Sequence, residues 1–227
     1  MGKKILMAVG GVVVLFLAAV ATRPAKFHIE RSATVAAPPA IAFAQVNDFH
    51  RWAEWSPWDK MDPSMKKTYE GPAAGVGSMY SWLGNDKVGE GKMTITESTP
   101  GAKVTLKLEF IKPFAATNMT TFTFAPEGEG TKVTWAMDGD NNFMSKAMQM
   151  FMSMDKMVGP DFEKGLSNLN TVSATVAKAE AEKAAAEKAA AEAAAKAEAE
   201  KAAAEKAAAD AAAAEAAAKA SKGKKKK

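Results

Sequence analysis

The sequence predicts an α+β fold in which an antiparallel sheet is followed by a long C-terminal helix. Three observations lead to this class. Apolar residues alternate with a period of two through the middle of the chain, which is typical of half-buried strands. A segment with helical periodicity follows the last of these strands. Strong compositional bias is confined to the ends, where an uncharged apolar run opens the chain and an Ala/Glu/Lys tract closes it.

The first 22 residues predict a transmembrane segment. Residues 5–21 contain no charge and would span about 26 Å as a helix, close to the thickness of a bilayer core. Two interpretations stay open: a signal-anchor that is kept, or a signal peptide cut after Ala21, where Ala-Val-Ala fits the cleavage pattern. We expect a single-pass protein of a bacterial inner membrane with a periplasmic domain. Release to the periplasm after cleavage and a cytoplasm-facing domain are the alternatives, because basic residues flank both sides of the segment.

Seven strands are predicted in the middle of the chain. The clearest alternation puts Val104, Leu106, Leu108 and Phe110 on one face of a strand. The tight "EGEG" turn at 127–130 indicates a hairpin. Short strands in close succession predict an antiparallel meander. The seven segments are Phe27–Val35, Lys66–Gly71, Ser78–Gly84, Gly91–Ser98, Lys103–Phe110, Thr117–Pro126 and Thr131–Asp138.

Two helices are predicted beside the sheet. Pro38–Asp48 begins with two prolines, which suit the first turn of a helix. Asn141–Val172 is expected to form one long helix, on which four residues make an apolar stripe. The stripe consists of Met144, Met148, Phe151 and Met152.

The C-terminal tract at 174–220 predicts a long solvated helix, because Ala, Glu and Lys all favour helix. The sequence at 179–192 recurs at 197–210, and an offset of 18 residues is five whole turns. The last segment, 221–227, is a basic and disordered tip. A solvated tip is one interpretation, and contact with nucleic acid or an anionic envelope polymer is the other.

The middle of the chain resembles the START-like (SRPBCC) superfamily, in its polyketide cyclase/dehydrase and lipid-transport branch. The resemblance covers residues 27–172. It is carried by "APP" before the first helix, by "WAEWSPW" at 52–58 and by "GPDFEKGL" at 159–166. It implies a helix-grip fold, in which a curved antiparallel sheet wraps around the long C-terminal helix and an apolar cavity lies between them.

The resemblance implies a cavity lined by the inward faces of the strands and the helix. We expect seven lining residues: Tyr80, Trp82, Phe110, Trp135, Met148, Met152 and Arg31. Arg31 is in phase with the apolar face of the first strand, so it needs an acidic partner or an anionic ligand unless a bulge turns it outward. The cluster Trp52, Trp55 and Trp58 is expected to close the cavity as a structural plug, with direct ligand contact as the alternative.

The sequence offers no catalytic constellation. It contains no cysteine, and its two histidines stand at no metal-ligand spacing. We therefore predict no metal, no cofactor and no catalytic residue.

Three functions follow from these features. The first is a membrane-anchored, non-catalytic domain that binds a hydrophobic small molecule or lipid. The second is a polyketide cyclase/dehydrase-type enzyme that would depend on His28, Asp138 or Asp140. The third is a scaffold whose basic helical tail binds nucleic acid or an anionic polymer.

Overall fold

The structure is a computed structural model that describes residues 2–223, with side chains described to residue 216. Contacts divide the chain into two compact units, Met1–Ala177 and Lys178–Lys227. The expected basic tip at 221–227 lies outside the described side chains, and its last four residues lie outside the described residues.

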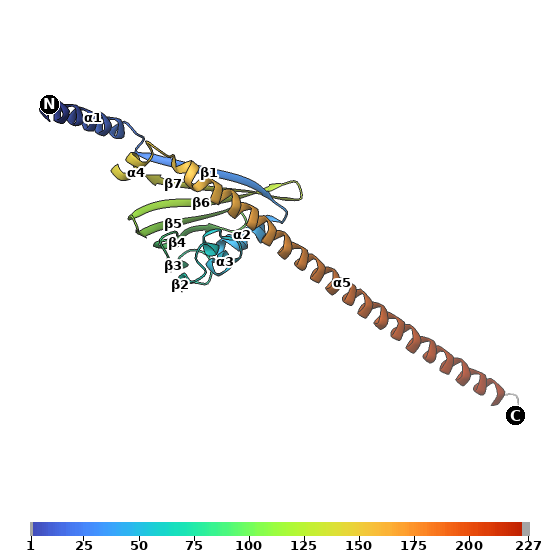
Figure 1. Ribbon diagram of the computed structural model, residues 1–227. Helices are drawn as coiled ribbons and strands as arrows, with labels where there is room; N and C mark the ends of the chain where they lie inside the picture. The colour runs from blue at the N-terminus through green and yellow to red at the C-terminus, as the bar shows by residue number, and fades with distance from the viewer. Residues whose placement is uncertain (1, 224–227) are drawn as a thin grey trace. The chain divides into compact units, whose positions relative to one another are not determined.

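The first unit is built on a seven-stranded antiparallel sheet with the order β1-β7-β6-β5-β4-β3-β2 (Figure 1). All seven predicted strands are present, and their bounds differ from the prediction by two residues at most. The predicted meander is confirmed from β2 to β7, and β1 returns to pair with β7. The strands are β1 (Lys26–Val35), β2 (Lys66–Glu70), β3 (Met79–Leu83), β4 (Glu90–Thr99), β5 (Lys103–Lys112), β6 (Ala116–Glu127) and β7 (Gly130–Asp140).

The helices before and between the strands are short. Helix α2 starts at Pro39, so a proline lies in its first turn, as predicted. Three more short helical segments follow it. The elements are α1 (Gly2–Ala21), α2 (Pro39–Asn47), η1 (Phe49–Arg51), α3 (Trp52–Trp55), η2 (Trp58–Lys60), α4 (Phe143–Met148) and α5 (Met154–Gly223).

The prediction of one continuous helix over 141–172 was wrong, because the chain breaks between α4 and α5. Two side chains begin new helices there. Asn142 accepts a hydrogen bond from the backbone N–H of Ser145 at 2.8 Å and caps α4. Ser153 accepts one from the backbone N–H of Lys156 at 3.3 Å at the start of α5.

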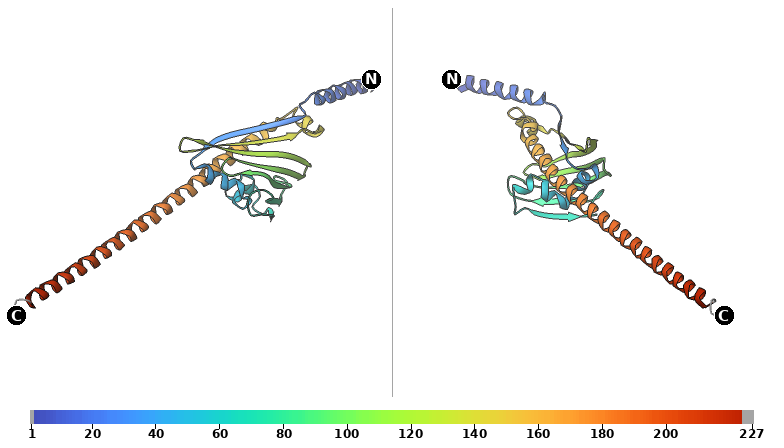
Figure 2. Two further views of the ribbon diagram at one scale, coloured as in Figure 1. Left: turned by 180° about the vertical axis from the view of Figure 1, so that it is seen from behind. Right: turned by 90° about the vertical axis from the view of Figure 1, so that its right-hand side faces the viewer.

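The first turns of α5 cross one face of the sheet (Figure 2). Phe162, Leu166 and Leu169 of α5 are buried in the core that the helix shares with the sheet. Alternate residues of the strands meet them, which is the reason for the period of two in the sequence. Helices α2 and α3 cover part of the same face, where Phe43 contacts Phe124 edge-on at 5.8 Å. A curved sheet that holds a long C-terminal helix is the helix-grip fold.

The second unit is the continuation of α5 from Lys178. Its described side chains are exposed. Lysine and glutamate pair one turn apart along it, as in Lys183–Glu187 and Lys196–Glu200. Exposed pairs of this kind contribute a few tenths of a kcal/mol each, about 0.2–0.5, so alanine propensity is the main support of this helix.

Candidate functional site

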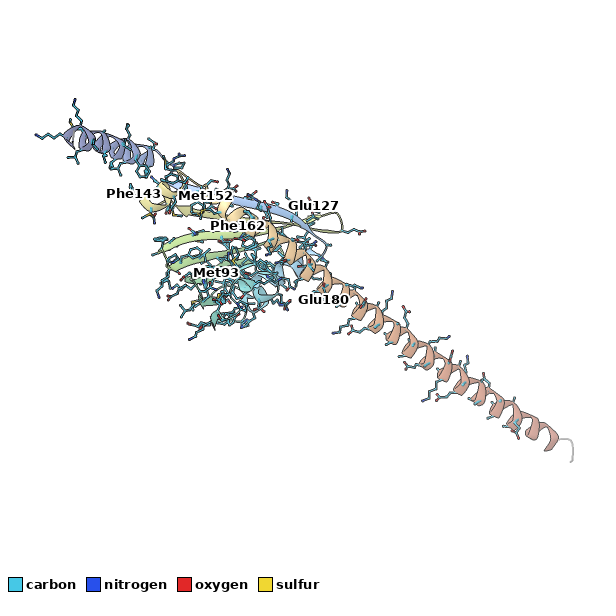
Figure 3. The ribbon with its side chains drawn as sticks, viewed as in Figure 1. Met93, Glu127, Phe143, Met152, Phe162 and Glu180 are labelled. Atoms are coloured by element: carbon cyan, nitrogen blue, oxygen red, sulfur yellow. The ribbon has the colours of Figure 1, made fainter. Side chains whose placement is uncertain are left out.

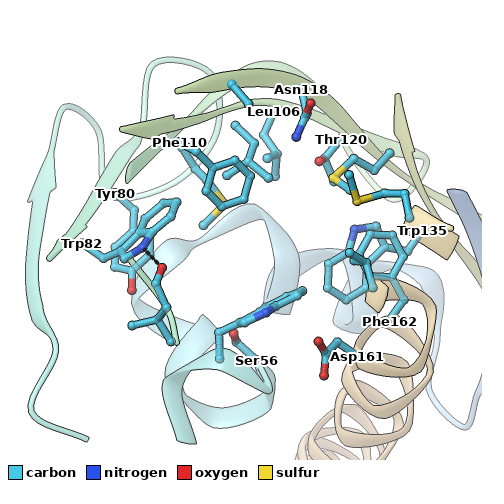
Figure 4. A pocket seen from close by; sticks show the side chains of 18 of the residues that line it. Ser56, Tyr80, Trp82, Leu106, Phe110, Asn118, Thr120, Trp135, Asp161 and Phe162 are labelled. Atoms are coloured by element: carbon cyan, nitrogen blue, oxygen red, sulfur yellow. Dashed lines mark hydrogen bonds between the residues drawn. The ribbon is translucent and has the colours of Figure 1, made fainter. Parts of the chain in front are cut away.

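An internal cavity of about 340 Å³ lies between the sheet and α5 (Figure 4). Its walls come from β1, from β3 to β7, from the short helical segments that follow α2, and from α4 and α5. Most of them are aromatic or aliphatic, including Trp52, Trp58, Tyr80, Trp82, Met93, Leu106, Phe110, Trp135 and Phe162.

Strand alternation places these side chains. Tyr80 and Trp82 are two residues apart on β3, and both point inward (Figure 4). Leu106, Leu108 and Phe110 are spaced two residues apart on β5 and also border the cavity. Their rings form a connected wall, since Tyr80 stacks on Trp82 at 5.9 Å and Trp82 meets Phe110 edge-on at 6.0 Å.

On the opposite side, α5 contributes Phe162, which stacks on Trp135 of β7. Trp58 meets Trp135 edge-on at 5.7 Å and Phe162 at 6.4 Å. Three segments far apart in the sequence therefore converge on one aromatic cluster. This cluster joins the sheet to α5 and forms part of the cavity wall.

Glycines leave room for this wall. A Cβ atom at Gly91 would lie 2.5 Å from the Trp82 ring, and one at Gly165 would lie 2.7 Å from the Trp135 ring. A Cβ at Gly139 would lie 2.2 Å from Oδ1 of Asn118. Each distance is shorter than the van der Waals contact distance of the two atoms. These positions therefore admit only glycine unless the cavity wall moves.

Two uncharged buried polar atoms in the wall have no hydrogen-bond partner in the described residues: Oγ1 of Thr120 and Nε1 of Trp135. Figure 4 shows both on the same side of the cavity, together with Asn118. A buried donor without a partner costs about 1–3 kcal/mol, so these atoms mark a place where a ligand acceptor would be stabilising.

The charges on the wall are all acidic. The lining side chains include Asp59, Asp140 and Asp161 but no Lys, Arg or His. Asp59 pairs with Lys67. Burial raises the pKa of the Asp161 carboxyl, and the nearby Lys164 partly opposes the shift. Burial also raises the pKa of the Tyr80 phenol, so the hydroxyl of Tyr80 stays neutral at physiological pH.

A family model described as polyketide cyclase / dehydrase and lipid transport matches residues 26–174, or 149 of the 227 residues. The chain belongs to this family. Solved structures similar to it include a protein from Chromobacterium violaceum, at 16% identity and TM-score 0.48 over 67% of this chain and 99% of that one. A Mesorhizobium loti protein is 19% identical, with a TM-score of 0.46 over 64% of this chain and 98% of that one. An aromatase/cyclase from Streptomyces sp. R1128 is 14% identical, with a TM-score of 0.49 over 65% of this chain and 93% of that one. Comparison with curated proteins gives no match.

In this member of the polyketide cyclase / dehydrase family, five of the seven expected lining residues border the cavity. They are Tyr80, Trp82, Phe110, Trp135 and Met148. Met152 does not line it. It lies in the break between α4 and α5, and its side chain is exposed.

Arg31 is also outside the cavity lining. Its guanidinium joins β1 to α5, with Nη1 2.8 Å from Oδ1 of Asp155 and Nε 2.7 Å from Oε1 of Glu163. Gly159 lies beneath it, where a Cβ would come within 2.2 Å of the guanidinium. Arg31 thus has acidic partners on α5, and its ion pairs hold β1 against that helix.

The tryptophan cluster divides between the two interpretations. Trp55 is fully buried, does not line the cavity and donates from Nε1 to the backbone carbonyl of Gln45 at 3.1 Å. Trp52 donates to the carbonyl of Val46 at 2.9 Å, yet its ring also borders the cavity, as does that of Trp58. The segment both closes the fold and lines the cavity.

The polar lining residues Asn118, Thr120 and Asp161 were missed. Asn118 and Thr120 are in phase with Phe122 on β6, so their inward direction was readable from the alternation. Asp161 gave no signal, because an aspartate one residue before Phe162 is usual on the solvated face of a helix.

His28, Asp138 and Asp140, on which a cyclase/dehydrase-type enzyme was expected to depend, do not come together in the cavity. Nδ1 of His28 is 2.8 Å from Asp138, a hydrogen bond that raises the pKa of the imidazole, but both side chains are exposed and neither borders the cavity. Asp140 borders the cavity and is exposed. Residues 2–216 hold no group of three His, Asp or Glu side chains arranged for a metal ion.

Proposed function

We propose that this chain is a membrane-anchored binding protein that holds an uncharged hydrophobic molecule between its sheet and α5. The observation that carries the proposal is the cavity itself. A volume of about 340 Å³ falls within the range of about 300–1,000 Å³ that is usual for small-molecule sites. Its aromatic lining offers dispersion contacts and excludes water.

The ligand class follows from the polar groups of the wall. A carboxylate or phosphate inside the cavity would meet the carboxyl groups of Asp140 and Asp161 and no Lys, Arg or His of the lining, and the nearby Lys67 is already paired with Asp59. A carbonyl or ether oxygen would instead accept from Oγ1 of Thr120 or Nε1 of Trp135, both of which lack a partner. A neutral molecule with one such acceptor therefore suits the cavity better than a fatty-acid anion.

Helix α1 supports the anchored form. It has 20 residues and is long and apolar enough to cross a membrane, which a signal sequence also achieves. We take it as a retained anchor, because its apolar run exceeds the usual length of a signal-peptide core.

The experiment is a binding titration with a matched pair of fluorescent ligands, cis-parinaric acid and its methyl ester. The ester is expected to bind more tightly than the acid at pH 7. Thr120→Val is expected to weaken ester binding about fivefold through loss of one hydrogen bond. Thr121→Val, one residue along β6, is the control and leaves binding unchanged. Equal affinity for both ligands, or no binding of either, would overturn the proposal.

A cyclase/dehydrase-type reaction is the second candidate. It is favoured by Asp161, whose carboxyl faces an apolar cavity and takes up a proton more readily than an exposed aspartate. Organic extraction of the purified chain followed by mass spectrometry separates the candidates. A carrier releases the molecule that it took up, whereas an enzyme releases a product that the Asp161→Asn variant does not form.

A further inference from the structure

Exposed apolar side chains cluster at one end of the first unit. We call this cluster the apolar rim, and it consists of Ile111, Phe114, Phe143, Met144, Phe151 and Met152. Phe151 is 85% exposed and Phe114 is 60% exposed, which is unusual for side chains of this size. Figure 3 shows Phe143 and Met152 at this end and Glu127 at the other end of the sheet.

The cavity opens inside the apolar rim. Phe114, Ala116 and Met148 line the cavity and are exposed at the same time, so they form its mouth. A cavity mouth that faced water would not need apolar side chains around it. Exposure of the apolar rim to water around this opening is unfavourable.

The chain connects α1 to this same end. Helix α1 ends at Ala21 and β1 begins at Lys26, so four residues separate them. This linker is held against the end of β7, since Asn141 donates to the carbonyls of Pro24 and Ala25 at 3.1 and 2.8 Å. Four extended residues span about 14 Å, so a bilayer that contains α1 lies within reach of the rim whatever the tilt of the helix.

Basic side chains accompany the rim. Arg23 lies on the linker, 3.3 Å from Sδ of Met150, while Lys26 begins β1 and Lys146 is on α4. Apolar side chains bordered by Arg and Lys are typical of surfaces that bind the interfacial layer of an anionic membrane.

We propose that the apolar rim inserts into the headgroup layer of the membrane that holds α1, so that the cavity opens directly onto the bilayer. A ligand then passes between lipid and cavity without crossing water. This inference rests on the proposed anchored binding function and adds to it the route of the ligand.

Depth-dependent quenching tests the insertion. The chain has no cysteine, so Phe151→Cys and Glu129→Cys each give one labelling site. Glu129 is exposed in the turn between β6 and β7, at the end away from the rim. The full chain is labelled with a nitrobenzoxadiazole dye and reconstituted in phosphatidylcholine/phosphatidylglycerol vesicles that carry nitroxide lipids.

We expect quenching at position 151 and none at position 129. Equal, weak quenching at both positions would overturn the inference. So would a blue-shifted but unquenched signal at 151 that depends on the protein-to-lipid ratio, because a second copy would then cover the rim.

Transfer of methyl parinarate from vesicles tests the route. Phe151→Ser/Met152→Ser in the full chain is expected to slow uptake from vesicles about tenfold, through weaker interfacial contact. Its equilibrium binding in detergent is expected to stay unchanged, because neither residue lines the cavity. Absence of binding in detergent would reject the proposed function, whereas normal binding with unchanged uptake would reject only this inference.

Discussion

The indole of Trp135 lies flat on the phenyl ring of Phe162, with centroids 4.1 Å apart and ring planes within 10°. This contact joins β7 to α5 across 27 residues of chain that include the break between the two last helices. Both rings also border the cavity. Stability of the helix-grip and the shape of the site therefore depend on the same pair.

Replacing Phe162 by Ala is expected to lower the free energy of unfolding by about 3–5 kcal/mol, because the ring is fully buried and its loss leaves a void. Chemical denaturation measures the change. Phe151→Ala is the control, since that ring is exposed, and it should shift stability by less than about 0.5 kcal/mol. Similar effects of the two substitutions would contradict the assigned packing.

Arg31→Gln is expected to destabilise the fold in a pH-dependent way. The Arg31 guanidinium lowers the pKa of the Asp155 carboxyl, so this pair contributes stability above the ordinary aspartate pKa of 3.8 and loses it as the pH falls through the folded-state pKa. The difference between wild type and variant should be largest at neutral pH and shrink in acid. Arg51→Gln, which removes a single longer ion pair to Asp48 at 3.7 Å, should have a smaller effect.

Asp161→Asn is expected to raise stability at pH 7. Burial raises the pKa of Asp161 above 3.8, so the folded state binds this proton more tightly than the unfolded state does. The wild type thus gains stability as the pH falls through the folded-state pKa, and the advantage of the variant disappears near pH 3.8. Thermal unfolding at several pH values checks this. A variant that is less stable than wild type at neutral pH would show that the carboxylate has a stabilising partner.

Gly165→Ala is expected to displace the Trp135 ring, because the new methyl group would lie 2.7 Å from it. Overpacking of this kind costs about 1–3 kcal/mol. Near-ultraviolet circular dichroism and methyl parinarate affinity should both change. Ser167→Ala, on the exposed side of the same helix, should alter neither.

Removal of residues 178–227 is expected to leave the midpoint of thermal unfolding unchanged, because contacts divide the chain between Ala177 and Lys178. If the lysine-rich end binds an anionic polymer, the same deletion abolishes salt-sensitive retention on heparin. A large drop in the unfolding midpoint would show that the extension supports the domain.

Most of the sheet was predictable from the sequence, because strand alternation is a local property. The same alternation correctly put Arg31 on the inner face of β1. The sequence did not predict its partners, since Asp155 and Glu163 are 124 and 132 residues away. Pairing over such separations depends on where α5 crosses the sheet, and no local pattern encodes that.

The break between α4 and α5 was missed for a different reason. Met144, Met148 and Phe151 repeat with helical spacing, and this favoured one continuous helix. The capping side chains Asn142 and Ser153 compete with that periodicity. An apolar stripe looks the same in sequence whether it faces a sheet or lies exposed at the rim.

The three glycines against Trp82, Asn118 and Trp135 limit how the cavity can change. Each one sets the depth of the cavity by omitting a single carbon atom. An added methyl group at any of the three would press on the ring or amide that it meets, so the site can narrow there only if its wall moves. The present depth of the cavity is therefore tied to glycine at these three positions.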